Sequence, residues 1–157
     1  MDIEDFVTVE QSLALKKLGF RENCLYFYAD NKLLPVSICI DADDDELLLN
    51  GEISVSVDTL LYQHQSKCND VHDGILESVL CDAPTLTQAQ KWLRKKKKLS
   101  IEPFSSLKKG KYTFEIINVD TWYEYNSSKT LSYHFDSYEE ALSAGITECI
   151  KLLENNL

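Results

Sequence analysis

Residues 112–119 read YTFEIINV, residues 130–135 read TLSYHF, and residues 137–153 read SYEEALSAGITECIKLL. The first two stretches alternate in the way typical of half-buried strands, so we expect them to pair around a loop near Asp120–Lys129. The third stretch repeats its apolar residues at the period of a helix. Gly145 lies within that apolar face and indicates a close approach of the helix to a sheet. The C-terminal third therefore predicts a hairpin with a helix packed on it.

Three helix starts carry a capping box, in which a Ser or Thr and a Glu or Gln three residues later bond each other's free amides. They begin at Thr8, Thr85 and Ser137. The helix from Thr8 should end at Leu18, because Gly19 stands where a left-handed cap is needed.

Strand signals fill the chain between these helices. They are Cys24–Ala29, Val36–Ile40, residues 53–57 after the turn dipeptide Asn50-Gly51, Ile75–Leu80 and Leu99–Phe104. Pro103 cannot donate a ladder hydrogen bond, so the last of these strands should lie at an edge. This order predicts an α+β fold in which two or three helices pack on one face of a mainly antiparallel sheet. We expect a single domain over residues 1–157, with exposed loops or turns at residues 40–52 and 120–129.

The composition predicts a soluble cytoplasmic protein. The chain is acidic, with a net charge of −10, and its first residues, MDIED, lack the basic and apolar regions of a secretory signal. No apolar run approaches the roughly 20 residues that span a bilayer. The five cysteines are odd in number and widely spaced, so we expect reduced thiols rather than disulfides.

Positive charge is concentrated in one segment of this acidic chain. Residues 91–111 contain nine basic residues and one acid, which leaves seven basic and 25 acidic residues elsewhere, a balance of −18. Lys91, Arg94, Lys95 and Lys98 follow helical spacing and should share one face, opposite the apolar Leu86, Ala89 and Leu93. Such a face suits an acidic protein surface or a nucleic-acid phosphate. A merely solvated face whose lysines complement the helix dipole explains it equally well.

Trp122, Tyr123 and Tyr125 form a second candidate binding group in the predicted loop. Exposed aromatic side chains are favoured anchors of protein interfaces. The alternative is that they extend the hairpin and pack against its faces.

Two patterns resemble metal sites, and neither is complete. Asp41, Asp43, Asp45 and Glu52 match four positions of a calcium loop, but Glu46 occupies the position that requires glycine. His64, Cys68 and His72 have a spacing that would suit zinc on a helix, and Asp73 or Cys81 could be a fourth ligand, yet no closed four-ligand spacing is evident. We expect no metal and no cofactor.

Catalytic motifs are missing from the sequence, which contains no nucleophile elbow, phosphate loop or dinucleotide fingerprint. The one chemical possibility is a contact between His134 and a cysteine thiol. We therefore predict that the protein is not an enzyme.

The segment APTLTQAQKWLR at residues 83–94 resembles small uncharacterised proteins of prophages and mobile elements in gut Bacteroidota-like bacteria. Residues 9–20 and 138–145 are similar to the same family, whereas residues 31–80 are not covered. The resemblance implies no activity and no functional residue.

Together these features predict a non-catalytic accessory protein that binds a host or element protein through its basic helix face, with the Trp122–Tyr125 loop. The alternatives are nucleic-acid binding through Lys91–Lys98 and nucleic-acid mimicry by the acidic remainder. No membrane partner is expected, and a homodimer is compatible with the sequence.

Overall fold

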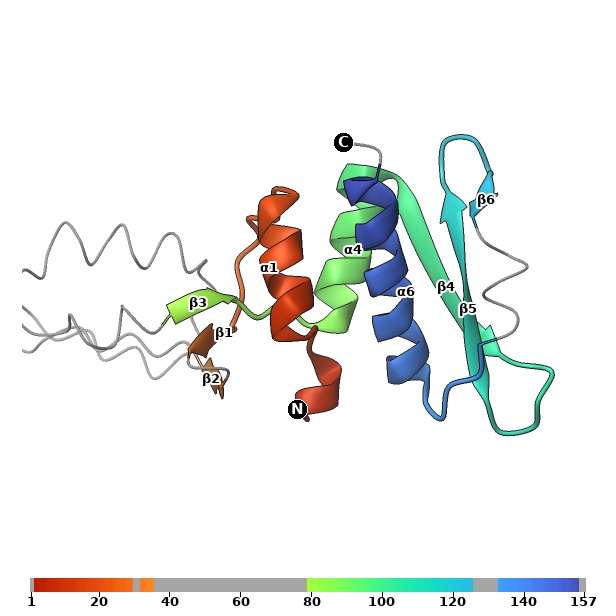
Figure 1. The fold of residues 1–157 in the computed structure, drawn as a ribbon, viewed down its shortest axis with the longest axis horizontal. Helices are drawn as coiled ribbons and strands as arrows, with labels where there is room; N and C mark the ends of the chain where they lie inside the picture. Colours follow the sequence, from red (N-terminus) through yellow and green to blue (C-terminus); the bar gives the residue numbers. More distant parts are fainter. Residues whose placement is uncertain (1, 30–31, 36–78, 126–132, 156–157) are drawn as a thin grey trace, which may run out of the picture. The chain divides into compact units, whose positions relative to one another are not determined.

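The computed structural model describes residues 2–29, 32–35, 79–125 and 133–155, which belong to two compact units (Figure 1). The first unit combines residues 1–20 with 85–157, and the second contains residues 21–84. Helices and small antiparallel sheets together confirm the α+β class. The single-domain organisation stays a prediction. Among the described residues, no helix is both long and apolar enough to cross a bilayer.

The first unit contains a three-stranded antiparallel sheet in the order β4-β5-β6. Its strands are β4 (Leu99–Ser105), β5 (Tyr112–Asn118) and β6 (Glu124–Tyr125). The order places β4 at an edge, as Pro103 predicts. Phe135 bridges Tyr112 in antiparallel orientation, so the predicted pairing is confirmed at that residue. The predicted loop at 120–129 was wrong at Glu124–Tyr125, because the chain turns within 119–122 and pairs with β5 immediately afterwards.

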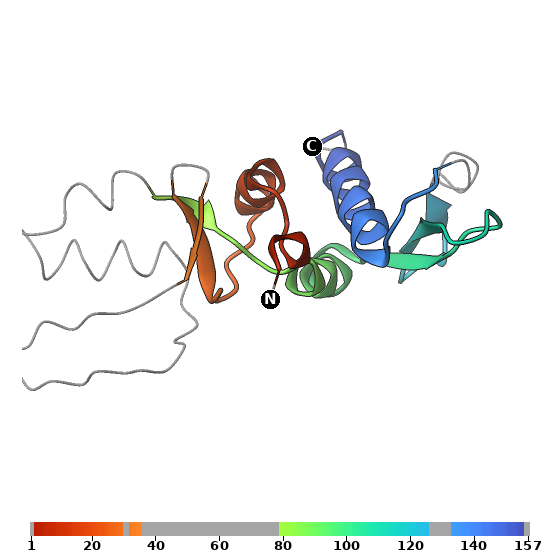
Figure 2. The same ribbon diagram turned by 90° about the horizontal axis from the view of Figure 1, so that it is seen from below.

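Two helices, α4 (Leu86–Lys97) and α6 (Tyr138–Glu154), cover one face of this sheet (Figure 2). The face is apolar because Ile101, Phe114 and Ile116 are all buried on it. A Cβ atom on Gly145 would stand only 2.4 Å from Cγ2 of Ile101. The close approach that Gly145 predicts is therefore confirmed, since only a residue without a side chain fits between α6 and β4.

The helix starts follow the capping pattern with one difference. Thr8 and Thr85 make both bonds of the box, ahead of α1 (Val9–Lys17) and α4. Ser137 accepts the backbone N–H of Glu140, but the Glu140 carboxylate accepts the N–H of Asp136, one residue before the expected position. Gly19 has a φ of +97° and ends the helix as predicted. A 3-10 turn, η1 (Ile3–Asp5), precedes α1.

Gln11 links α1 to α6 through hydrogen bonds. Its buried side-chain NH₂ donates to the carbonyl oxygen of Ser143 and to Oγ1 of Thr147, both at 2.8 Å. Its side-chain oxygen completes the cap by accepting the N–H of Thr8. One amide therefore both caps a helix and joins it to another.

The second unit is a three-stranded antiparallel sheet in the order β2-β1-β3. Its strands are β1 (Tyr26–Ala29), β2 (Lys32–Pro35) and β3 (Val79–Asp82). The sequence predicted β1 and part of β3 but missed β2. The expected strands at 36–40 and 53–57 lie outside the described residues, as does the expected loop at 40–52. The thiols of Cys24 and Cys81 here, and of Cys149 in α6, are buried.

Candidate functional site

The basic segment of the sequence is divided by the fold between two ends of the first unit. Lys91, Arg94 and Lys95 lie on α4, whereas Lys108 and Lys109 lie in the loop after β4. The seven residues of β4 separate the two groups by roughly 20 Å. Figure 1 shows the end of α4 and the β4–β5 loop at opposite ends of the sheet. Residues 91–111 therefore form no single patch.

The cations on α4 are exposed because its apolar residues face inward. Leu86, Ala89, Trp92 and Leu93 are buried, which confirms the predicted apolar stripe. Lys91, Arg94, Lys95 and Lys96 are exposed, and no described acidic group lies within ion-pair distance of them. Lys97 differs from them, because its Nζ atom lies 5.3 Å from the ring centroid of Trp92, within the range of a cation–π contact.

Lys98 does not lie on the helix face where the sequence placed it. The helix ends at Lys97, and Lys98 adopts the left-handed conformation with a φ of 62°, a position usually taken by glycine. Its carbonyl oxygen accepts a 2.9 Å hydrogen bond from the N–H of Val119. Its Nζ atom lies 3.9 Å from the Asp120 carboxylate, although both side chains are largely exposed and so the pair adds little. Lys98 thus joins the end of α4 to the turn after β5.

That turn holds an exposed aromatic side chain. Asn118 closes the turn through its side-chain oxygen, which accepts the N–H groups of Asp120 and Thr121. Trp122 donates its N–H to the carbonyl of Asn118 and has a φ of 56°, while 82% of its surface is exposed. A bulky residue in the left-handed region is uncommon and strained. The backbone therefore holds the indole out in solvent at an energetic cost.

Tyr123 and Tyr125 continue the aromatic group beyond the turn. Their rings meet edge to face with centroids 5.0 Å apart, and Tyr123 is 62% exposed. We call the combined surface the basic end; it consists of Lys91, Arg94, Lys95, Lys96, Lys98, Trp122 and Tyr123.

The sequence predicted most members of the basic end but no reason for their proximity. Lys98 and Val119 are separated by 21 positions and meet only through the pairing of β4 with β5, in which Leu99 lies opposite Asn118. Lys96 was missed because it falls outside the helical spacing of the predicted face. Figure 1 shows the turn after β5 and the last turn of α4 at the same end of the sheet.

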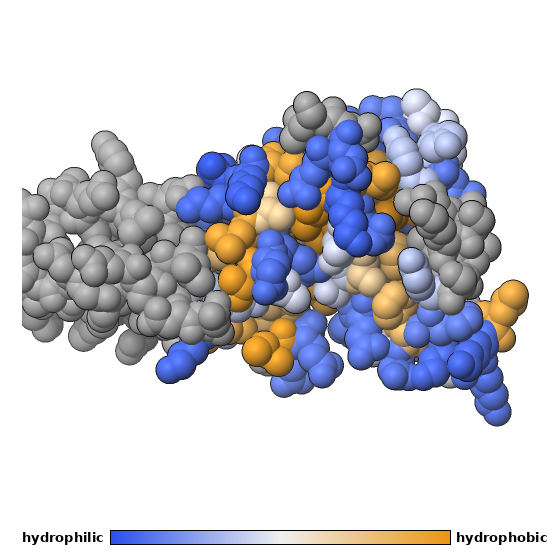
Figure 3. All heavy atoms as spheres, in the orientation of Figure 1, coloured by the Kyte–Doolittle hydropathy of each residue, from blue (hydrophilic) through white to orange (hydrophobic). Residues whose placement is uncertain are grey.

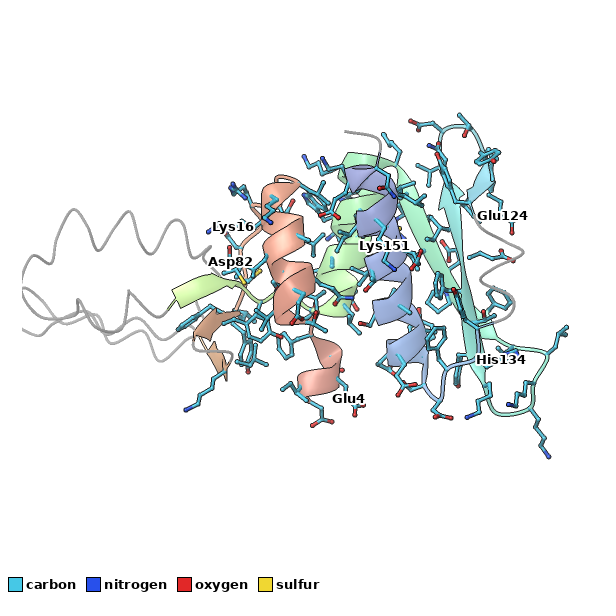
Figure 4. All side chains as sticks on the ribbon, viewed as in Figure 1. Glu4, Lys16, Asp82, Glu124, His134 and Lys151 are labelled. Atoms are coloured by element: carbon cyan, nitrogen blue, oxygen red, sulfur yellow. The ribbon has the colours of Figure 1, made fainter. Side chains whose placement is uncertain are left out.

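His134 contacts a hydroxyl rather than a thiol. Its Nδ1 atom lies 2.7 Å from Oγ of Ser106, beside the β4–β5 loop (Figure 4). A working nucleophile–base pair needs a third group that orients the base. Within the described residues no such group is bonded to this imidazole. Burial also raises the pKa of the Cys149 thiol, which therefore stays protonated and weakly nucleophilic.

No cluster of potential metal ligands occurs in the described parts of the chain. The calcium-like run at residues 41–52 and the weak zinc candidates His64, Cys68 and His72 lie outside those parts.

Comparisons with protein-family models, with curated proteins and with solved structures found no match.

Proposed function

We propose that the protein is a non-catalytic accessory protein that binds an acidic surface of another protein through its basic end. The observation that carries this proposal is the junction at Lys98, which brings the turn with the exposed Trp122 to the end of a helix that carries four exposed cations without described acidic partners. Following the resemblance at residues 83–94, we place it in a phage or mobile element, with a host or element protein as partner in the cytoplasm.

The helix dipole does not account for the positive charge of α4. A helix C-terminus carries the equivalent of about half a negative charge. Four cations, Arg94 to Lys97, occupy the last turn of α4. Like charges three or four residues apart on a helix repel, so this number exceeds what the helix itself requires. The simplest role for this excess positive charge is to bind a negatively charged group of another molecule.

Protein is favoured over nucleic acid by the distribution of charge and aromatic residues. The first unit contains 13 basic and 13 acidic residues, so the net charge of −10 comes from the second unit. A unit so acidic repels a phosphate backbone, which carries one charge per roughly 1.7 Å of duplex. An exposed tryptophan beside basic side chains is also typical of a protein interface, where Trp, Tyr and Arg supply most of the binding energy.

Two charge-reversal variants test the proposal in a pull-down from bacterial host lysate treated with nuclease. Arg94→Glu/Lys95→Glu changes the basic end, and Lys108→Glu/Lys109→Glu makes the same change in charge at the far end of β4. All four side chains are exposed, so both variants should fold. We expect one protein, captured by the wild type and by the far-end variant, to be lost with Arg94→Glu/Lys95→Glu.

The other outcomes distinguish the alternatives. Equal loss in both variants would indicate non-specific charge attraction and contradict the proposal. Loss of every partner on nuclease treatment would favour nucleic-acid binding instead. A partner that is lost only when Asp41–Glu46 are neutralised would favour nucleic-acid mimicry.

A further inference from the structure

The end of the first unit that lies opposite the basic end has a groove with an acidic rim. A hollow of about 510 Å³ lies between η1, α1 and the first turns of α6, and its lining includes Ile3, Phe6 and Phe135. A neighbouring hollow of about 310 Å³ reaches the start of α4 and includes Leu86 and Leu142. Glu139 lines both hollows. We call the two together the acidic groove.

Four carboxylates border the acidic groove without a described cation opposite them. They are Glu4, Asp5, Glu139 and Glu140. No lysine, arginine or histidine of the described chain lines either hollow. Figure 4 shows Glu4 on η1, at the same end of the unit as the first turn of α6. In Figure 3, which has the orientation of Figure 1, hydrophobic and hydrophilic side chains lie side by side on the visible face of the first unit.

The chemistry of the groove defines its occupant. The apolar side chains in its lining suit a large apolar or aromatic side chain, and its carboxylates, which share the two hollows with no described cation, suit flanking cations. Ile3 is 72% exposed, so apolar surface is available for contact. The basic end carries both complements, namely the exposed indole of Trp122 and the cations around Arg94. We propose that the acidic groove binds the basic end of a second copy of this chain.

The contact must form between two molecules rather than within one. The groove reaches Leu86 at the start of α4, whereas the basic end begins at Lys91 and continues past the end of the helix to the turn that carries Trp122. Arg94 lies eight residues after Leu86, which is about 12 Å along the helix axis, and the turn with Trp122 lies at the far end of α4. Association is therefore head to tail, with two different surfaces in contact, and each added copy leaves one groove and one basic end free.

This inference rests on the proposed function, because both use the basic end as a binding surface. An acidic partner and a second copy exclude each other there, so the partner should dissociate the self-assembly.

Two variants that each lose one surface test the inference by sedimentation velocity of the full chain. Arg94→Glu/Lys95→Glu removes the basic end, and Glu4→Lys/Glu139→Lys removes the groove. We expect the average mass of the wild type to rise with concentration at physiological ionic strength. In about 1 M salt the Debye length falls to roughly 3 Å, so the wild type should return to monomer. Each variant alone should stay monomeric.

An equimolar mixture of the two variants is the decisive sample. One variant supplies an intact groove and the other an intact basic end, so the mixture should form a discrete pair of chains that grows no further. Lys108→Glu/Lys109→Glu should associate like the wild type. Glu4→Gln/Glu139→Gln, which avoids a cation at a helix N-terminus, should also weaken association, and circular dichroism verifies that every variant folds.

The inference is overturned if the wild type stays monomeric at every concentration. It is also overturned if the mixture of the two variants stays monomeric. If the same Arg94→Glu/Lys95→Glu variant still loses its acidic protein partner in the pull-down, the proposed function stands without self-association. If that variant keeps the partner, the basic end is not the binding surface and both proposals fail.

Discussion

The carbonyl oxygen of Lys98 accepts a 2.9 Å hydrogen bond from the backbone N–H of Val119. This single bond ties the end of a basic helix to a turn that presents Trp122. Both partners are backbone groups, so the position of the turn relative to the end of the helix does not depend on a mobile side chain. The backbone segments that carry the cations and the indole are therefore held together before any partner arrives, which lowers the entropy cost of binding.

Replacing Trp122 with glycine should separate folding from binding. Trp122 has a φ of 56°, and the left-handed region costs a residue with a Cβ atom roughly 1 kcal/mol or more. Its side chain is 82% exposed and so adds little to the core. Trp122→Gly should raise the free energy of unfolding by about 1 kcal/mol relative to Trp122→Ala, while both variants lose partner binding. If denaturant titration finds Trp122→Gly less stable than Trp122→Ala, the backbone at this position is not strained.

Adding one methyl group at Gly145 should destabilise the first unit. The new Cβ would lie 2.4 Å from Cγ2 of Ile101 and 3.2 Å from Phe114. Overpacking of this kind costs about 1–3 kcal/mol, which exceeds the gain of up to about 1 kcal/mol from replacing glycine in a helix. Thermal unfolding of Gly145→Ala checks the sign. In the double variant Gly145→Ala/Ile101→Ala the two effects should be less than additive, because the clash is gone.

Removing the Gln11 side chain should lower the free energy of unfolding more than removing the Gln88 side chain. Both residues complete capping boxes, but Gln11 also donates to Ser143 and Thr147 from a buried position. With about 1 kcal/mol for each hydrogen bond, Gln11→Ala should lose roughly 1–2 kcal/mol more stability than Gln88→Ala in chemical unfolding. Equal losses would show that the bonds between α1 and α6 contribute nothing.

Glu115 should make the protein less stable at neutral pH than at acid pH. Burial, followed by the charge and hydrogen bond of Glu124, raises the pKa of Glu115 above its ordinary value of 4.5. The folded state therefore binds this proton more tightly than the unfolded state does, and the resulting stability is present below the ordinary pKa and lost as pH rises through the folded value.

Glu115→Gln stays neutral throughout and should gain stability relative to the wild type as pH rises from below 4.5 to neutral. Glu124→Gln removes only the smaller causes and should show part of that gain. Unfolding curves at several pH values measure both effects. A difference between Glu115→Gln and wild type that does not change with pH would refute the assignment.

Local signals in the sequence predicted the helices well. A capping box is encoded by two residues three positions apart, and Thr8 and Thr85 show it as expected. Gly145 likewise predicted the contact of its helix with the sheet, because a glycine within an apolar helix face usually marks a place where another element packs closely. β6 and the exact place of Lys98 were missed, since no glycine marks the end of α4 and no standard turn dipeptide marks the turn before β6.

The candidate surfaces were harder to predict because they depend on strand pairing. The nine basic residues of 91–111 fall within one segment of the sequence, yet β4 places Lys108 and Lys109 far from Arg94. The acidic groove combines Glu4 with Glu139, which are 135 positions apart and share no local pattern. Only the packing of η1 and α1 against α6 brings them together.

A photo-crosslinking amino acid placed at two exposed positions would show directly whether the basic end is the surface that contacts the partner. One position is Tyr123 in the basic end, and the other is Leu107, a fully exposed residue in the β4–β5 loop at the opposite end of the sheet. After irradiation in nuclease-treated host lysate, we expect a covalent product with one protein from position 123 and none from position 107. Equal labelling at both positions, or labelling at position 107 alone, would contradict the basic end as the binding surface.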